Sequence, residues 1–480
     1  MFPAKVCCPL FRSALLILSG NMTASLLQLA RNLLIARLVS VEDYGIAATF
    51  AVVMAVVEMM AAFGLQQQIV QAKEGNDPHF QAVLQGFQVL RGLIQAVVLL
   101  VIAGPMARFL GIPEVTWAYR LLAVVPLLNA LSHFDVHRLS RQMRFAPMIL
   151  TSTVPAVVSL AAVWPLTRWL GGWQVMLGVI LIHATVMLVL SHLVAERPYR
   201  LAFDRAIVAG SLRFGWPLLV NGAMMFLIFN GERLIVGREL GMAELAIFSM
   251  GVTLTLTPTL VMAGSLQSFF LPQLSARRGA GEAFQHLADV TMQANLLMAL
   301  VFVAGTVLAG GPVVLLLLGE KYAALLPLLI GLALVQAVRV LKAGCAVIAL
   351  SLGQTGNAMV ANLIRVLALP LGWYALIRTG DLQILIGIAL AAETIGFAVA
   401  IGILRIRRSI KLRRLVLPVG VMGLMAAAAA SYGWNAAASL SGMPGPGILL
   451  LCLAHMALGL YVMRDLRLYV VRRHLAGFEE

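Results

Sequence analysis

The chain has 480 residues, of which 61% are hydrophobic and only 11% are charged, and its mean hydropathy is +0.95. Too few polar residues remain to cover a water-exposed surface of this size, so the composition excludes an ordinary soluble enzyme and predicts a protein embedded in lipid. The net charge of +15 does not indicate a nucleic-acid partner, because the basic residues are scattered between apolar segments and no soluble basic module gathers them.

The first apolar run extends from Ser13 to Leu38 and follows Lys5 and Arg12, an arrangement that resembles a signal peptide. The run is too long for the apolar region of a signal peptide and has no clear A-x-A cleavage site before Arg31. We therefore interpret it as a retained first membrane span.

The whole chain is built from apolar segments of the length that a membrane span requires. A span needs about 20 mostly apolar residues to cross about 30 Å of hydrocarbon, with every backbone group hydrogen-bonded inside the helix. The sequence therefore predicts an all-α integral membrane protein of about fourteen spans. Their approximate ranges are 14–36, 44–66, 83–107, 116–135, 147–166, 173–195, 213–235, 246–271, 289–318, 322–350, 356–377, 382–404, 414–432 and 447–464.

The connections between these segments differ in positive charge. One side of the predicted membrane receives 22 of the 35 Lys and Arg residues and the other side receives seven. Because positive charge accumulates on the cytoplasmic side, both termini are predicted to be cytoplasmic and the number of spans to be even.

A weak internal repeat appears when the chain is shifted by 201 residues, so that Arg37 meets Arg238. Duplicated halves are common in secondary transporters. Each half holds six spans and enters the membrane from the same side, which makes the repeat parallel. We expect an N-terminal lobe at 1–200, a C-terminal lobe at 201–404, and at 405–480 two accessory spans with a basic cytoplasmic tail.

Six basic residues remain inside the predicted spans, where a central charge costs roughly 2.5 to 3.5 kcal/mol on insertion scales. Embedded acids are fewer, which predicts a basic cavity for an anionic substrate, and guanidinium groups suit phosphate oxygens. Structural alternatives are a snorkelling Arg91 and an ion pair between Glu232 and Arg233. The candidate binding residues are Arg31, Arg91, Arg233, Arg339, Lys342 and Arg365, and the candidate ion-coupling acids are Glu58, Glu232 and Glu393.

Polar residues recur at helical spacing in the first and seventh predicted spans. Such residues line an aqueous path or seal one helix against another, and Arg31 on the first span favours the path. The candidates are Asn21, Gln28, Asn32, Asn221 and Asn230.

A further segment, "HRLSRQMRF" from His137 to Phe145, alternates arginines with apolar residues. This composition is typical of a short helix at the membrane interface, which either anchors the protein or gathers acidic headgroups.

Patterns of catalysis and metal binding are absent from the sequence. It has no P-loop, its eight histidines have no metal-ligand spacing, and its four cysteines form no spaced set. We therefore expect neither a cofactor nor a metal, and no enzymatic activity.

Three segments resemble a known family: "ARLVSVEDYGIAATF" from Ala36 to Phe50, "FGLQQQIVQ" from Phe63 to Gln71, and "RLSRQMRF" from Arg138 to Phe145. Together with a count of twelve plus two spans, they are similar to the polysaccharide transport and Wzx-type oligosaccharide flippases, in the superfamily that also holds MATE drug exporters and the lipid II flippase.

This resemblance implies two six-helix lobes around a basic cavity, and alternating-access movement of an undecaprenyl-diphosphate-linked oligosaccharide across a bacterial inner membrane. The partners would be this substrate, membrane lipids, and the polymerase and glycosyltransferases of polysaccharide synthesis. Two alternatives stay open: a cation-coupled multidrug exporter of the same fold, which would favour an acidic cavity, and a membrane glycosyltransferase or ligase, which typically needs a larger outer loop than this chain has.

Overall fold

The computed structural model describes residues 23–61, 64–354, 356–408, 418–420, 423–424, 427–428 and 446–476. Within these ranges every regular element is a helix, which confirms the predicted all-α class. The chain divides into two compact units, Met1–Ala246 and Ile247–Glu480. The predicted lobe boundary at residue 200 and the internal repeat stay predictions.

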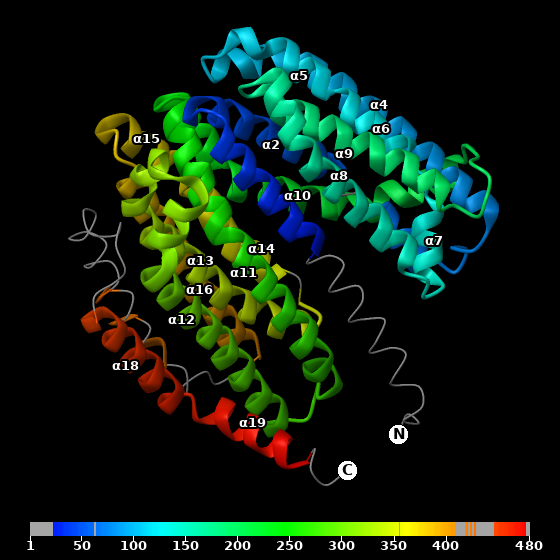
Figure 1. The fold of residues 1–480 in the computed structure, drawn as a ribbon. Coiled ribbons are helices and arrows are strands. Elements are labelled where there is room, and N and C mark those ends of the chain that lie inside the picture. The colour runs from blue at the N-terminus through cyan, green and yellow to red at the C-terminus, as the bar shows by residue number, and fades with distance from the viewer. Residues whose placement is uncertain are drawn as a thin grey trace. The chain divides into compact units, whose positions relative to one another are not determined.

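In the first unit, α4, α6, α9 and α8 are successive neighbours that lie side by side, and α2 packs against α10 (Figure 1). Residues 23–38 are also helical. The labelled elements are α2 (Val41–Ala61), α3 (Leu65–Gln71), α4 (Pro78–Phe109), η1 (Pro113–Val115), α5 (Thr116–Leu122), α6 (Val124–Leu131), α7 (Asp135–Arg141), α8 (Ala146–Leu170), α9 (Gln174–Leu193), α10 (Arg205–Glu239) and the start of α11 (Met242–Ala276).

In the second unit, α13 packs against α12 and α16, and α16 also packs against α14. The core between them contains Leu287, Val340 and Leu404, each at most 1% exposed. Besides the rest of α11, the elements are α12 (Glu282–Leu318), η2 (Glu320–Leu325), α13 (Leu326–Ser351), α14 (Gly356–Leu367), α15 (Leu369–Thr379), α16 (Leu382–Arg408), α18 (Pro446–Val462) and α19 (Arg464–Ala476).

Eight helices among the described residues are long and apolar enough to cross a membrane, or up to ten if each of two bent pairs forms one span. Much of the predicted spans 14–36 and 414–432 lies outside the described residues. The chain is thus a multi-pass membrane protein, and the count of fourteen stays a prediction.

Two of the predicted spans each contain one non-helical residue close to a proline. The segment 116–135 breaks at Ala123 between α5 and α6, because Pro126 has no N–H to donate to the carbonyl of Leu122. The segment 356–377 breaks at Ala368, two residues before Pro370, because Pro370 has no N–H to donate to the carbonyl of Val366. Gly356–Thr379 is nonetheless long and apolar enough to be one span, and Pro113–Leu131 forms one together with Asp135–Arg141.

The turn into α2 contains the Glu42-Asp43-Tyr44-Gly45 motif. The hydroxyl of Ser40 donates to Asp43 at 2.6 Å and accepts from the Asp43 N–H at 3.0 Å, a local cap that starts the helix. A Cβ on Gly45 would lie 1.8 Å from the carbonyl oxygen of Met242, so only glycine permits this approach to the start of α11. The motif therefore fixes the contact between the first turn of α2 and the first residue of α11.

A buried cluster of basic residues as the candidate site

Three helices of the second unit bring four of the predicted site residues together. The carboxylate of Glu393, which is fully buried, lies 2.7 Å from Nε of Arg339, 2.5 Å from Nζ of Lys342 and 3.4 Å from Nε of Arg365. Arg339 also donates to the amide oxygen of Gln336 at 3.3 Å. We call Arg339, Lys342, Arg365 and Glu393 the basic cluster.

Helical spacing explains half of the basic cluster. Arg339 and Lys342 are three residues apart on α13, so both side chains lie on the face that packs against α16. Gln336 extends the same row by one more turn. The pair could be placed on one face from the sequence alone.

The other half depends on a close approach of two backbones. A Cβ on Gly396 of α16 would lie 2.7 Å from the carbonyl oxygen of Ala361 on α14. Glu393 lies one turn before Gly396, and Arg365 lies one turn after Ala361, which brings their side chains to the same level. Glycine at 396 thus positions Arg365 beside Glu393, a role that the sequence analysis missed. In the sequence, this role is indicated only by the position of Gly396, three residues after the embedded acid Glu393.

The basic cluster carries three positive charges and one negative charge. The exposed fractions of its side chains are 14% for Arg339, 12% for Lys342, 2% for Arg365 and 0% for Glu393. Burying ions costs several kcal/mol each, and one carboxylate compensates one cation in full. The remaining positive charge favours an anion with several acceptor oxygens, such as a phosphate group, as a ligand.

In the first unit, Arg31 and Arg233 both interact electrostatically with the buried Tyr44. Arg31 also donates to the side-chain oxygen of Asn32, at 3.4 Å from Nε and 3.3 Å from Nη2. The structure thus associates Arg31 with Arg233. Arg91 lies half-buried on α4 and stays a candidate on its sequence position.

The predicted polar path and coupling acids are only partly described. Asn21, and the side chains of Glu58 and Asn221, lie outside the described residues. Gln28 is exposed, and Asn230 is buried and donates to the carbonyl of Phe226 in its own helix at 3.3 Å. Glu232 is half-buried on α10. The path, and the coupling roles of Glu58 and Glu232, stay predictions.

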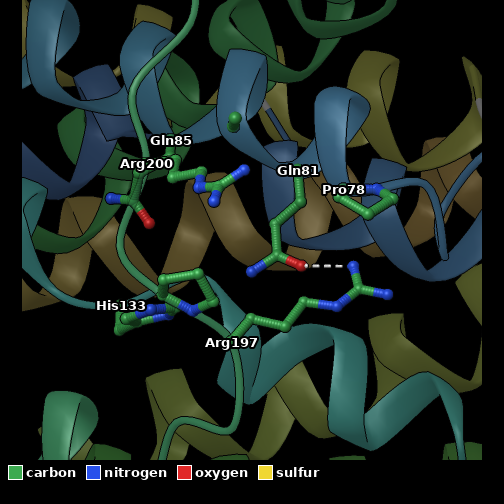
Figure 2. A pocket seen from close by; sticks show the side chains of 8 residues that line it. Pro78, Gln81, Gln85, His133, Arg197 and Arg200 are labelled. Carbon is green, nitrogen blue, oxygen red and sulfur yellow. Dashed lines mark hydrogen bonds between the residues drawn. The ribbon is translucent and has the colours of Figure 1, made fainter.

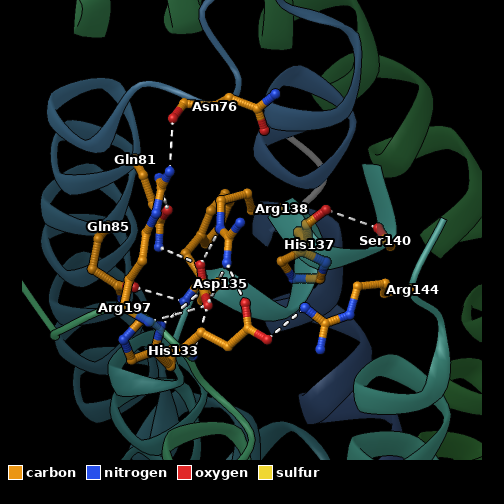
Figure 3. A network of polar contacts seen from close by, with 12 residues as sticks. Asn76, Gln81, Gln85, His133, Asp135, His137, Arg138, Ser140, Arg144 and Arg197 are labelled. Carbon is orange, nitrogen blue, oxygen red and sulfur yellow. Dashed lines mark hydrogen bonds and ion pairs between the residues drawn. The ribbon is translucent and has the colours of Figure 1, made fainter. Parts of the chain in front are cut away.

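The amphipathic segment after α6 is a short helix, α7, whose arginines are engaged by the protein (Figure 3). Arg138 pairs with Asp135 at 2.5 Å and with Glu196 at 3.2 Å, and Arg144 pairs with Glu196 at 2.5 Å. Arg141 donates to backbone carbonyls at the end of α3, at 2.8 Å to that of Val70. Intramolecular partners thus occupy all three guanidinium groups, which argues against the expectation that they gather acidic headgroups.

Asp135 is the centre of this network. Its carboxylate accepts from Arg138, from the side-chain amide of Gln81 at 3.3 Å, and from the backbone N–H groups of Glu196 at 2.9 Å and Arg197 at 3.4 Å. Burial raises the pKa of the Asp135 carboxyl, but the bonds from Arg138 and the Glu196 N–H outweigh it and lower that pKa to about 2. The network fastens the connection between α9 and α10 to the end of α6.

Comparison with known proteins shows the family to which the chain belongs. Residues 34–327 match the family described as "Polysaccharide biosynthesis protein". A relative, the succinoglycan biosynthesis transport protein ExoT of Rhizobium meliloti (strain 1021), is 22% identical over 298 residues, which are 62% of this chain and 60% of that relative. The chain thus spans less than two thirds of the length of this curated relative.

Two solved structures share the fold. The lipid II flippase MurJ in an inward closed conformation superposes with a TM-score of 0.67 at 14% identity, covering 96% of this chain and 100% of that one. An inward-facing multidrug resistance MATE family transporter of the MOP superfamily superposes with a TM-score of 0.64 at 16% identity, covering 87% of this chain and 95% of that one. The chain belongs to the polysaccharide biosynthesis protein family, and it has the fold of these MATE and lipid II flippase structures.

Proposed function

We propose that the protein moves an undecaprenyl-diphosphate-linked oligosaccharide across the bacterial inner membrane by alternating access, during synthesis of a cell-surface polysaccharide. Both termini would lie in the cytoplasm. The glycosyltransferases of the same polysaccharide would supply the substrate, and its polymerase would consume the product.

The basic cluster is the observation that carries this proposal. Three cations lie around the buried carboxylate of Glu393, so these four side chains together carry more positive than negative charge, and a diphosphate offers several acceptor oxygens to such a group. Family membership and the name of the Rhizobium relative, a polysaccharide transport protein, support the same substrate class.

Within this proposal, Glu393 is a counter-ion that holds the cluster together while the binding position is empty. Its three partners are all cations, and they would exchange part of their interaction with Glu393 for interaction with the diphosphate. Ion coupling would then belong to Glu232 or Glu58. That all six embedded basic residues contact the substrate stays a prediction.

The multidrug exporter is the rival with the same fold. A cationic drug would gain nothing from Arg339, Lys342 and Arg365, because like charges repel strongly in a low-dielectric site. Transport of an anionic diphosphate and of a cationic drug can therefore be compared to distinguish the two functions.

The test is a flipping assay in proteoliposomes with a fluorescent undecaprenyl-diphosphate-linked oligosaccharide, scored by protection from a membrane-impermeant quencher. Lys342→Gln, which keeps the side chain's ability to donate a hydrogen bond but removes its charge, should slow flipping by about tenfold. Lys321→Gln, which neutralises an exposed lysine in η2, is the matched control and should leave the rate unchanged. Flipping by Lys342→Gln at the wild-type rate would contradict the proposal. So would transport of a cationic dye, and not of the lipid-linked oligosaccharide, by the wild-type protein.

A further inference from the structure

A second basic site lies in the first unit, away from the basic cluster. A pocket of about 270 Å³ opens at the level where α4 begins and where α6 and α9 end (Figure 2). Its polar lining comes from Gln81 and Gln85 of α4, from His133, and from Arg197 and Arg200. Because three spanning helices begin or end here, the pocket lies at the height of the lipid headgroups.

The pocket is formed by a connection that is fixed in place. Between α9 and α10, the N–H of Ala202 donates to the carbonyl of Ala82 at 3.1 Å, and the side chain of Gln85 donates to the hydroxyl of Tyr199 at 3.3 Å. The connection is thus held along α4 at both positions. A ligand would meet a preformed site and would not have to order the chain.

The charge of the pocket is positive. Arg197 is oriented by Gln81, whose side-chain oxygen accepts from Nη1 at 2.9 Å, and by the carbonyl of Asn76, which accepts from Nη2 at 2.8 Å. Arg200 is exposed and forms no hydrogen bond or ion pair with the part of the chain that the structure describes. No acidic residue lines the pocket, and the nearby Asp135 is occupied by Arg138.

His133 adds a buried donor. The side chain is 5% exposed, and its Nδ1 accepts from the N–H of Asp135 at 3.1 Å, which leaves the proton of the neutral ring on Nε2. The ring of His133 also interacts with the backbone of Arg197, which holds the imidazole in the lining of the pocket.

We propose that this pocket binds the phosphate group of an anionic phospholipid, with Arg197 and Arg200 as its charged contacts. Exposed apolar residues on both sides of Arg197 and Arg200 in the chain indicate a lipid: Leu193, Leu201 and Phe203 are 74%, 55% and 69% exposed. Basic residues next to exposed apolar ones at the membrane surface are typical of headgroup binding, where the acyl chains cover the apolar side chains. This site is independent of the proposed transport function.

The experiment is native mass spectrometry of the purified full chain with phosphatidylglycerol, phosphatidylcholine or undecaprenyl diphosphate. Wild-type protein should retain phosphatidylglycerol over phosphatidylcholine, and Arg200→Gln should weaken that retention by about tenfold while Arg200→Lys keeps most of it. The matched control is Arg205→Gln, which removes an exposed arginine that does not line the pocket. Since Arg200 is exposed and forms no hydrogen bond or ion pair with the described residues, its substitution should leave the unfolding temperature unchanged.

Three results would overturn the proposal. The first is equal retention of phosphatidylglycerol by wild type and Arg200→Gln, and the second is an equal loss in Arg205→Gln, which would indicate a diffuse effect of surface charge. The third is displacement of the lipid by inorganic phosphate, which would make free phosphate the ligand. If Arg200→Gln weakened undecaprenyl diphosphate alone, the pocket would be a substrate site, and the phospholipid assignment would be wrong.

Discussion

Arg365 of α14 and Glu393 of α16 face each other, with 3.4 Å between Nε and a carboxylate oxygen, and the two side chains are 2% and 0% exposed. Arg339 and Lys342 approach the same carboxylate from α13. Three helices of the second unit are thus joined at one buried charge.

Loss of the carboxylate should destabilise the protein far more than loss of one cation. Glu393→Gln leaves three buried cations without their counter-charge, and we expect the free energy of unfolding to fall by about 3 to 5 kcal/mol. The measurement is the unfolding temperature of purified protein in detergent.

Lys342→Met provides the comparison for that variant. It leaves Glu393 with two cations and removes the repulsion of Lys342 by Arg339 and Arg365. The expected loss in the free energy of unfolding is therefore much smaller than in Glu393→Gln. Equal losses in the two variants would mean that the carboxylate does not hold the cluster together.

The approach of α14 to α16 should depend on the glycine at 396. In Gly396→Ala the new Cβ would lie 2.7 Å from the carbonyl of Ala361, and the backbones must separate, so we expect a loss of about 1 to 3 kcal/mol. Gly402→Ala in the same helix is the control, because nothing lies within 4 Å of its added Cβ. Alanine is the better helix former, so helix propensity alone would raise the unfolding temperature of both variants. Unfolding temperatures that fall equally in both would mean that the contact with Ala361 is not the cause.

The polar network of the first unit should make stability depend on acidic pH through Asp135. The pKa of this carboxyl is about 2 in the folded protein, against an ordinary value of 3.8, so its ionised form is stabilised by folding. A lowered pKa contributes stability that is complete above pH of about 4 and is lost as the pH falls toward 2, by about 2 kcal/mol in total.

Asp135→Asn is the variant that tests this dependence. It should be less stable than wild type at pH 6, and the difference should shrink as the pH is lowered from 5 to about 3, as followed by the unfolding temperature. A difference that stayed constant over this range would show that Asp135 acts by hydrogen bonding alone and not by charge.

The sequence predicted the elements of the basic cluster but not their arrangement. Apolar length predicted most helices, and counting charges within them identified Arg339, Lys342, Arg365 and Glu393. That Glu393 lies among three cations depends on packing between helices that are far apart in the chain, through Gly396, and periodicity carries no such information.

Local sequence could not predict the role of a segment where two different roles require the same composition. The arginines after α6 have the composition of a lipid-binding helix, yet Arg138 and Arg144 are used by Asp135 and Glu196. The partners that decide these roles come from distant parts of the chain.

The most direct test of the basic cluster as a diphosphate site is the affinity of purified protein for undecaprenyl diphosphate, measured for wild type, Lys342→Gln and Lys321→Gln. We predict that Lys342→Gln binds about tenfold more weakly while Lys321→Gln binds as wild type does, with all three proteins equally folded. Equal affinity in wild type and Lys342→Gln would contradict the account.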